Sequence, residues 1–83
     1  MNFVNVLIDC SYEKDGYVGD HCITGSVDLA GDLVSQCNDL ISEWADRKLR
    51  IWGQRYKVTK VHFAHYEYNG RFIEIEGMKG YKY

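Results

Sequence analysis

The sequence predicts an α+β domain of two layers, in which an antiparallel sheet packs on one amphipathic helix in the order β-β-α-β-β. Two observations support this prediction. The turn motifs Lys14-Asp15-Gly16 and Asn69-Gly70 each separate two segments suited to strands. Between the two pairs lies one long segment with apolar residues at helical spacing. A helix lying across an antiparallel sheet is the compact way to bury a single apolar layer.

The first predicted hairpin starts with a strand over Phe3–Ile8, whose alternate residues are apolar. Asp and Gly tolerate the positive φ that a hairpin turn needs, so Lys14–Gly16 predicts a tight turn. The segment Tyr17–Thr24 then returns as the second strand. Gly19 weakens the interior of that strand, which favours a sheet edge or a bulge there.

The central segment, from Ser26 to about Leu49, is predicted to be a helix. Ser26 is a suitable N-cap, and Asp28 stands in the first turn, where the helix dipole favours an acid. Gly53 supplies the stop signal. The apolar stripe of this helix consists of Leu29, Leu33, Cys37, Leu40, Ile41 and Trp44.

The second predicted hairpin joins strands over Arg55–Tyr68 and Arg71–Glu76, because Asn-Gly is the strongest short hairpin signal. A two-residue loop predicts the pairs Tyr68–Arg71, Tyr66–Ile73, His65–Glu74 and Ala64–Ile75. One face then holds Ala64, Tyr66, Ile73 and Ile75, and the sequence favours it as the core face. The other face holds Val61, Phe63, His65, Phe72, Glu74 and Glu76, and its aromatic residues leave the choice of core face open.

The length of 83 residues predicts a single compact domain over residues 1–83, with residues 77–83 as a loose C-terminal tail. A chain of this size buries only a thin core, and a deep pocket would remove much of it. Its size therefore favours binding by a surface over catalysis in a cleft.

Charge is divided between the two halves of the chain. Residues 1–46 contain nine acids and one base, a net charge of −8, whereas residues 47–83 contain nine bases and three acids, a net charge of +6. Such a division indicates charged partners without naming them. The sequence contains no long apolar span and no secretory signal, and its three widely spaced cysteines suit reduced thiols. These features predict a cytoplasmic protein, with no membrane partner.

An acidic ridge is predicted along the helix, opposite its apolar stripe. Its members fall within one narrow sector at about 100° per residue. One interpretation is the ordinary solvated face of an amphipathic helix. The other is a surface that imitates a phosphate backbone or docks on a basic groove, which the near absence of cations favours because a solvated face usually mixes both signs. The ridge consists of Asp28, Asp32, Asp39, Glu43 and Asp46.

A basic-aromatic set follows the helix and interleaves cations with flat rings. Single-stranded nucleic acid is held in this way, with bases stacked on rings and phosphates met by cations. The alternative interpretation is that the rings belong to the core and the cations balance the acidic half. The set consists of Arg50, Trp52, Arg55, Tyr56, Lys57, Lys60, Tyr68 and Arg71.

No pattern in the sequence predicts catalysis, a cofactor or a metal site. His62 and His65 are three apart on a predicted strand, so we expect them on opposite faces, where they cannot share a metal. The cysteines show no standard zinc-ligand spacing. Neither a nucleophile beside a base nor a glycine-rich phosphate loop is recognisable. We therefore expect a protein that is not an enzyme.

In layout, the chain resembles the small proteins that phages make against bacterial defences, such as anti-CRISPR proteins and phage antitoxins. It is a short α+β domain with a strand from the first residues, Met1-Asn2-Phe3-Val4-Asn5-Val6, divided charge and no catalytic motif. The resemblance implies an inhibitor that binds a host defence protein or ribonucleoprotein complex in an infected bacterium. The alternatives are a single-stranded RNA- or DNA-binding module using the basic-aromatic set, and a homo-oligomeric structural protein whose charged faces pair between subunits.

Overall fold

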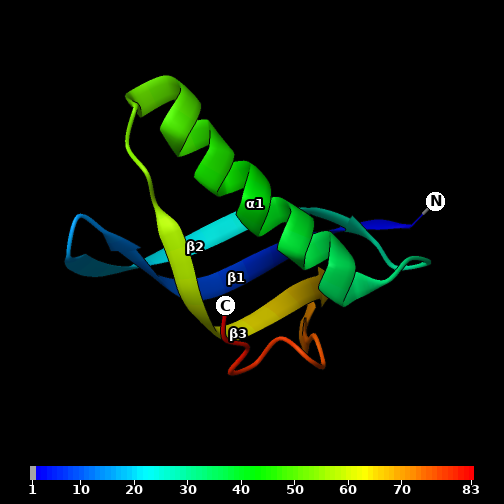
Figure 1. The fold of residues 1–83 in the computed structure, drawn as a ribbon. Helices are drawn as coiled ribbons and strands as arrows, with labels where there is room; N and C mark the ends of the chain where they lie inside the picture. The colour runs from blue at the N-terminus through cyan, green and yellow to red at the C-terminus, as the bar shows by residue number, and fades with distance from the viewer. Residues whose placement is uncertain (1) are drawn as a thin grey trace.

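A computed structural model describes residues 2–83 and confirms the α+β class and the β-β-α-β-β order. All neighbouring strands are antiparallel, and their order in the single sheet is β2-β1-β3-β4. The helix lies across one face of this sheet (Figure 1). The elements are β1 (Phe3–Lys14), β2 (Tyr17–Asp28), α1 (Leu33–Trp52), β3 (Lys57–Tyr68) and β4 (Arg71–Glu74).

Both predicted hairpin turns are confirmed, and each has two residues with positive φ. Asp15 and Gly16 have φ of 50° and 78°, and Asn69 and Gly70 have φ of 52° and 74°. Residues on either side of each turn are directly paired. Two consecutive positive φ values match the right-handed twist of the strands, which explains why these dipeptides are favoured there. The predicted pairs Tyr68–Arg71, Tyr66–Ile73 and His65–Glu74 are those observed.

The predicted start of the helix at Ser26 is wrong, because β2 continues to Asp28 and the helix begins at Leu33. The longer β2 matches the length of β1, with Asp28 opposite Phe3, and it fully buries Val27. These non-local contacts outweigh the local helix signals. The predicted stop is confirmed, since Gly53 caps the helix with φ of 65° and its N–H bonds to the carbonyl of Leu49.

The core lies between the sheet and a second layer that contains α1. Alternate residues of β1 face this layer, and Val6, Ile8 and Cys10 are almost completely buried. The favoured face of the second hairpin is confirmed as the core face by the burial of Ala64 and Ile75. The helix adds three buried side chains, Cys37, Ile41 and Trp44.

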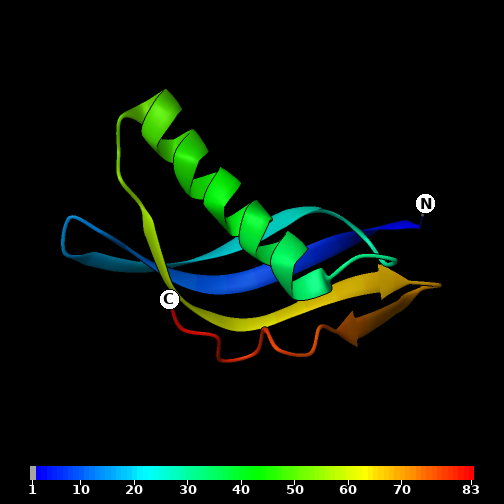
Figure 2. The same cartoon turned by 45° about the vertical axis from the view of Figure 1, so that its right-hand side comes forward.

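The prediction that residues 77–83 form a loose tail is wrong. Met78 is fully buried, and backbone hydrogen bonds hold the segment beside β3, including those from Gly80 N–H to the carbonyl of Val61 and from Tyr83 N–H to the carbonyl of Thr59. Tyr83 also donates its hydroxyl proton to Asn38 of the helix. The segment runs back along β3 toward the end where that strand begins (Figure 2). Burial of Met78 provides the apolar driving force that a free tail would lack.

A bulge in β3 changes which residues face the core. The register between β1 and β3 shifts because Asp9 pairs with Phe63 whereas Cys10 pairs with Val61. Val61 is therefore fully buried instead of lying on the outer face as predicted. The extra residue is His62, whose ring contacts Ser11 on the side of the sheet opposite α1. His62 and His65 consequently lie on the same face, and the prediction of opposite faces is wrong.

Candidate functional site

The acidic ridge is shorter than predicted because two of its five members are not on the helix. Asp28 ends β2, and Asp32 is the N-cap, accepting a hydrogen bond from Ser35 N–H at 3.2 Å. The remaining members are exposed on α1. One of them, Glu43, pairs with Arg47 at 3.1 Å, so the ridge also carries a cation. The continuous ridge is reduced to Asp39, Glu43 and Asp46.

The structure divides the basic-aromatic set into two groups at opposite ends of β3. Arg50 and Trp52 belong to the last turns of α1, and Arg55, Tyr56 and Lys57 follow them into the start of β3. Lys60 is exposed further along that strand. Tyr68 and Arg71 flank the β3–β4 turn, which lies about 36 Å along the strand from Lys57 at 3.3 Å per residue.

Tyr56 is enclosed by neighbours. Its ring centroid lies 5.0 Å from that of Tyr12 and 5.4 Å from that of Trp44. The ammonium groups of Lys14 and Lys48 lie 5.4 and 5.7 Å from its centroid. These contacts occupy the ring surfaces on which a base would stack.

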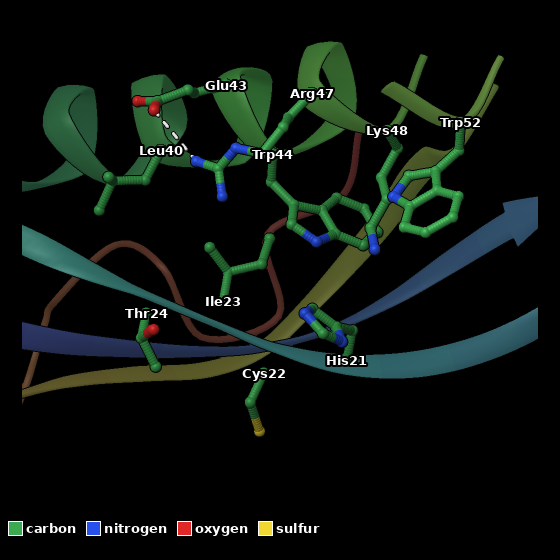
Figure 3. A pocket seen from close by; sticks show the side chains of 10 residues that line it. All are labelled: His21, Cys22, Ile23, Thr24, Leu40, Glu43, Trp44, Arg47, Lys48 and Trp52. Carbon is green, nitrogen blue, oxygen red and sulfur yellow. Dashed lines mark hydrogen bonds and ion pairs between the residues drawn. The ribbon is translucent and has the colours of Figure 1, made fainter. Parts of the chain in front are cut away.

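The C-terminal end of α1 projects beyond the sheet (Figure 1). We call it the helix end, and it exposes Leu49, Ile51 and Trp52. A hollow of about 240 Å³ lies between this half of the helix and β2 (Figure 3). Within it His21 stacks on Trp44 at 5.0 Å, and burial together with the charge of Lys48 lowers the pKa of His21.

The opposite side of the sheet is covered by no element of residues 2–83 (Figures 1 and 2). We call this side the open face. One residue of each strand lies in register across it, and these four residues are Thr24, Leu7, His65 and Glu74. The next row contains Phe63, whose ring stacks on His65 with centroids 5.6 Å apart.

Phe72 is the most prominent side chain of the open face. It is 71% exposed, and its ring meets His65 edge-on at 4.9 Å. Two shallow hollows of about 460 and 350 Å³ lie on either side of the His65–Phe72 pair. Glu67 is directly opposite Phe72 on the neighbouring strand, and Glu74 is two residues along the same face. The open face thus presents an exposed aromatic ring, in contact with His65, beside two carboxylates.

Ser11, Asp20 and His62 form a hydrogen-bonded group across three strands of the open face. Ser11 Oγ donates to Asp20 Oδ1 at 2.7 Å and lies 2.6 Å from His62 Nε2. The hydrogen bond from Ser11, with a smaller contribution from His62, lowers the pKa of Asp20.

This group resembles a catalytic triad in composition but not in geometry. A triad needs the histidine to take the serine proton, and the carboxylate to hold the other ring nitrogen. Here the hydroxyl proton goes to Asp20, which lies 3.5 Å from the same Nε2 atom that contacts Ser11. Because Ser11 donates its proton to Asp20, it accepts from Nε2 of His62 in this arrangement, so His62 is not placed to take the serine proton. The arrangement ties His62, the extra residue of the bulge, to side chains of β1 and β2.

Across residues 2–83, no three His, Cys, Asp or Glu side chains are grouped so that they could hold a metal ion. The described chain also contains no helix long and apolar enough to cross a membrane. Comparison with family models, curated proteins and solved structures finds no match to this chain.

Sequence reasoning missed the open face as a candidate surface. Its rows combine residues from β1, β2 and β3 that are far apart in the chain, so their proximity depends on strand order. The available signal was the aromatic content of the second face of the β3–β4 hairpin. That signal was ambiguous because either face could have been the core.

Proposed function

We propose that the protein is a non-enzymatic inhibitor that binds a partner protein through the open face and blocks the partner's own interactions. The observation that carries this proposal is the exposure of Phe72 beside Glu67 and Glu74, with its ring in edge-on contact with His65. A few residues commonly supply most of the binding energy of an interface, and aromatic residues are enriched among them.

The charges around Phe72 indicate the kind of partner. Two carboxylates flank the ring, and Lys79 lines the hollow on one side. A partner surface with an apolar pocket and arginine or lysine residues at its rim would complement this pattern. Proteins that bind nucleic acid expose such basic surfaces. The resemblance to phage counter-defence proteins therefore makes a bacterial defence protein or nucleoprotein complex the first class of partner to test.

The geometry supports protein binding over the alternative of single-stranded nucleic acid. The basic-aromatic set lies in two groups, and Tyr56 is enclosed by other rings and by lysine side chains. At the helix end, Leu49 and Ile51 accompany Trp52, and aliphatic side chains offer bases no stacking surface. Arg50 and Trp52 thus suit a second protein contact better than a nucleic-acid track.

Three surface variants distinguish the candidate contact surfaces. Phe72→Asp alters the open face, Trp52→Asp alters the helix end, and Asp39→Lys with Glu43→Lys alters the acidic ridge. Binding is measured by titration calorimetry against purified defence complexes, with circular dichroism to confirm that each variant is folded. We expect Phe72→Asp to weaken binding at least about 30-fold, a typical effect for the loss of an aromatic residue that supplies much of the binding energy.

Each candidate contact surface predicts a different pattern of binding among the variants. Loss of binding only in Trp52→Asp, or only in the ridge variant, would contradict the open face as the contact surface. Binding of single-stranded RNA or DNA that falls steeply with salt and disappears in Arg55→Glu with Lys57→Glu would instead identify the nucleic-acid alternative.

A further inference from the structure

β2 is the long unprotected edge of the sheet within residues 2–83. It has 12 residues, and its pairing with β1 is regular from one end to the other. Proteins usually protect such edges with charged side chains, lysine above all, or with proline, a bulge or a very short strand. The charge in the middle of β2, Asp20, is engaged by Ser11 and His62 of the same copy. β2 contains no lysine, arginine or proline, and its register shows no shift. On the other side of the sheet, β4 has only four residues, and residues 77–83 lie beside β3.

A side chain of the helix shows which backbone groups of β2 point outward. Asp28 N–H donates to Oε1 of Gln36 at 2.7 Å, and Nε2 of Gln36 donates to the carbonyl of Asp28 at 2.9 Å. Gln36 thus imitates the peptide group of a neighbouring strand on the side away from β1. In an antiparallel pair this outward orientation recurs at every second residue. The other outward positions are therefore Val18, Asp20, Cys22, Thr24 and Ser26.

These five positions are self-complementary. If a second copy lies antiparallel with Cys22 opposite Cys22, then Asp20 pairs with Thr24 and Val18 pairs with Ser26, each of them twice. In this register the outward N–H and C=O groups of all five positions form hydrogen bonds with the second copy. No two like charges lie opposite each other. The register also puts the Asp28–Gln36 contact opposite the turn of the second copy, at Gly16, where the paired strand ends.

We propose that β2 is a self-association edge, on which two copies of this chain pair β2 against β2 about a two-fold axis through Cys22. The product is one continuous sheet with both helices on the same side. The open faces of the two copies then form a single surface that presents Phe72 twice. This inference uses the edge alone and does not depend on the function proposed for the open face.

Cys22 reports directly on the proposed register. Directly opposed, hydrogen-bonded residues of an antiparallel pair have Cα atoms about 5.5 Å apart, within the range that a disulfide spans. Cys22 is exposed and points away from the helix (Figure 3), whereas Cys10 and Cys37 are fully buried. Diamide, which takes up two electrons and two protons from two thiols, should therefore yield a reducible dimer joined at Cys22, as mapped by peptide mass spectrometry. Cys22→Ser should still dimerise but give no cross-link.

Two substitutions at one position test the register without a cross-link. Thr24 is exposed and lies opposite Asp20 of the second copy. Thr24→Lys adds two opposite-charge pairs to the dimer, whereas Thr24→Asp adds two like-charge pairs. We expect sedimentation equilibrium to show dissociation constants for the two variants that differ roughly tenfold, with Thr24→Lys the tighter. Circular dichroism of both variants should match that of the parent protein.

A monomeric mass at every concentration up to the solubility limit would overturn the proposal, as would equal affinities for the two Thr24 variants. Cross-links that map to other cysteines would also contradict it. A monomer whose partner binding is still lost in Phe72→Asp would overturn the self-association edge while leaving the proposed function intact.

Discussion

At the scale of single residues, two positions determine how α1 meets the sheet. Asp32 caps the first turn through the N–H of Ser35, and its carbonyl also receives the N–H of Gln36. Gly25 permits the close approach of the helix, because a Cβ atom there would lie 2.6 Å from a methyl carbon of Leu40. The hydrogen bond of Asp32 sets where the helix begins. The absence of a side chain at Gly25 allows the helix to pack close to β2.

The cap gives a prediction for Asp32→Ala. The substitution leaves the N–H of Ser35 without its side-chain acceptor, so we expect a loss of about 1 kcal/mol in the free energy of unfolding. Urea denaturation followed by circular dichroism measures it. Ser42→Ala, at an exposed position inside the helix, is the matched control and should change stability very little. An equal loss in both variants would contradict the capping role of Asp32.

Residues that act through their own backbone were predictable from sequence. Asp15-Gly16 and Asn69-Gly70 form the predicted turns because positive φ is a local demand that few residue types meet. Asp32 was instead assigned to the ridge, since a cap cannot be recognised when the start of the helix is misplaced. The start was misplaced because Asp28 pairs with Phe3, which is a distant residue.

At the scale of elements, residues 77–83 act together with α1 to cover the sheet. Met78 is fully buried, and Gly77 lies close enough to the helix that a Cβ atom would meet a methyl group of Val34 at 3.1 Å. An isolated bridge between Lys60 and Lys82 ties the segment to β3. The helix therefore provides only part of the second layer.

Shortening Met78 tests this assignment. Met78→Ala removes a fully buried side chain, so we expect a loss of 2–5 kcal/mol in the free energy of unfolding, roughly the range for such core truncations. Chemical denaturation measures the loss. Lys79→Ala, at the neighbouring exposed position, serves as the control. A loss below about 0.5 kcal/mol for Met78→Ala would mean that the segment does not contribute to the core.

The bulge in β3 could not be predicted from the sequence of β3 alone. Strict alternation places Val61 on the same face as Phe63, whereas the structure buries Val61 and moves His62 to the open face. The cause is the pairing with β1, where Ser11 and Asp20 provide partners for the extra histidine. Hairpins with short loops were predictable, and the β1–β3 pairing across the helix was not.

At the scale of the whole molecule, the core contains two thiols that stay protonated. Burial, followed by the charge of Asp9, raises the pKa of Cys10 to about 11, and burial alone raises the pKa of Cys37 to about 11. In the unfolded chain both thiols return to an ordinary pKa of 9.0. The unfolded chain therefore releases protons above pH 9 that the folded chain retains.

Stability should consequently fall at alkaline pH. The contribution of these thiols is fully present below pH 9.0 and is lost as the pH rises toward about 11. We expect a decrease on the order of 2 kcal/mol for each thiol over this interval, measured as the shift of the urea midpoint. Cys37→Ala, compared with its own stability at neutral pH, should show a smaller decrease. A decrease of the same size in that variant would contradict the role of Cys37.

The position of β1 between β2 and β3 has a consequence for how the chain folds. The β1–β2 pairing grows outward from a two-residue turn, whereas β1 meets β3 through pairs such as Val6–Tyr66, which close a loop containing β2 and the entire helix. Closing so long a loop lowers the chain entropy before the stabilising β1–β3 contacts have formed. We therefore expect the β1–β3 pairing to limit the folding rate. Until β3 arrives, the first hairpin exposes the second side of β1 as well as the edge of β2. The first hairpin alone therefore leaves two long strand edges unpaired, those of β1 and β2, whereas in the folded residues 2–83 β2 is the long one that remains. Association during refolding should consequently be most sensitive to substitutions in β1.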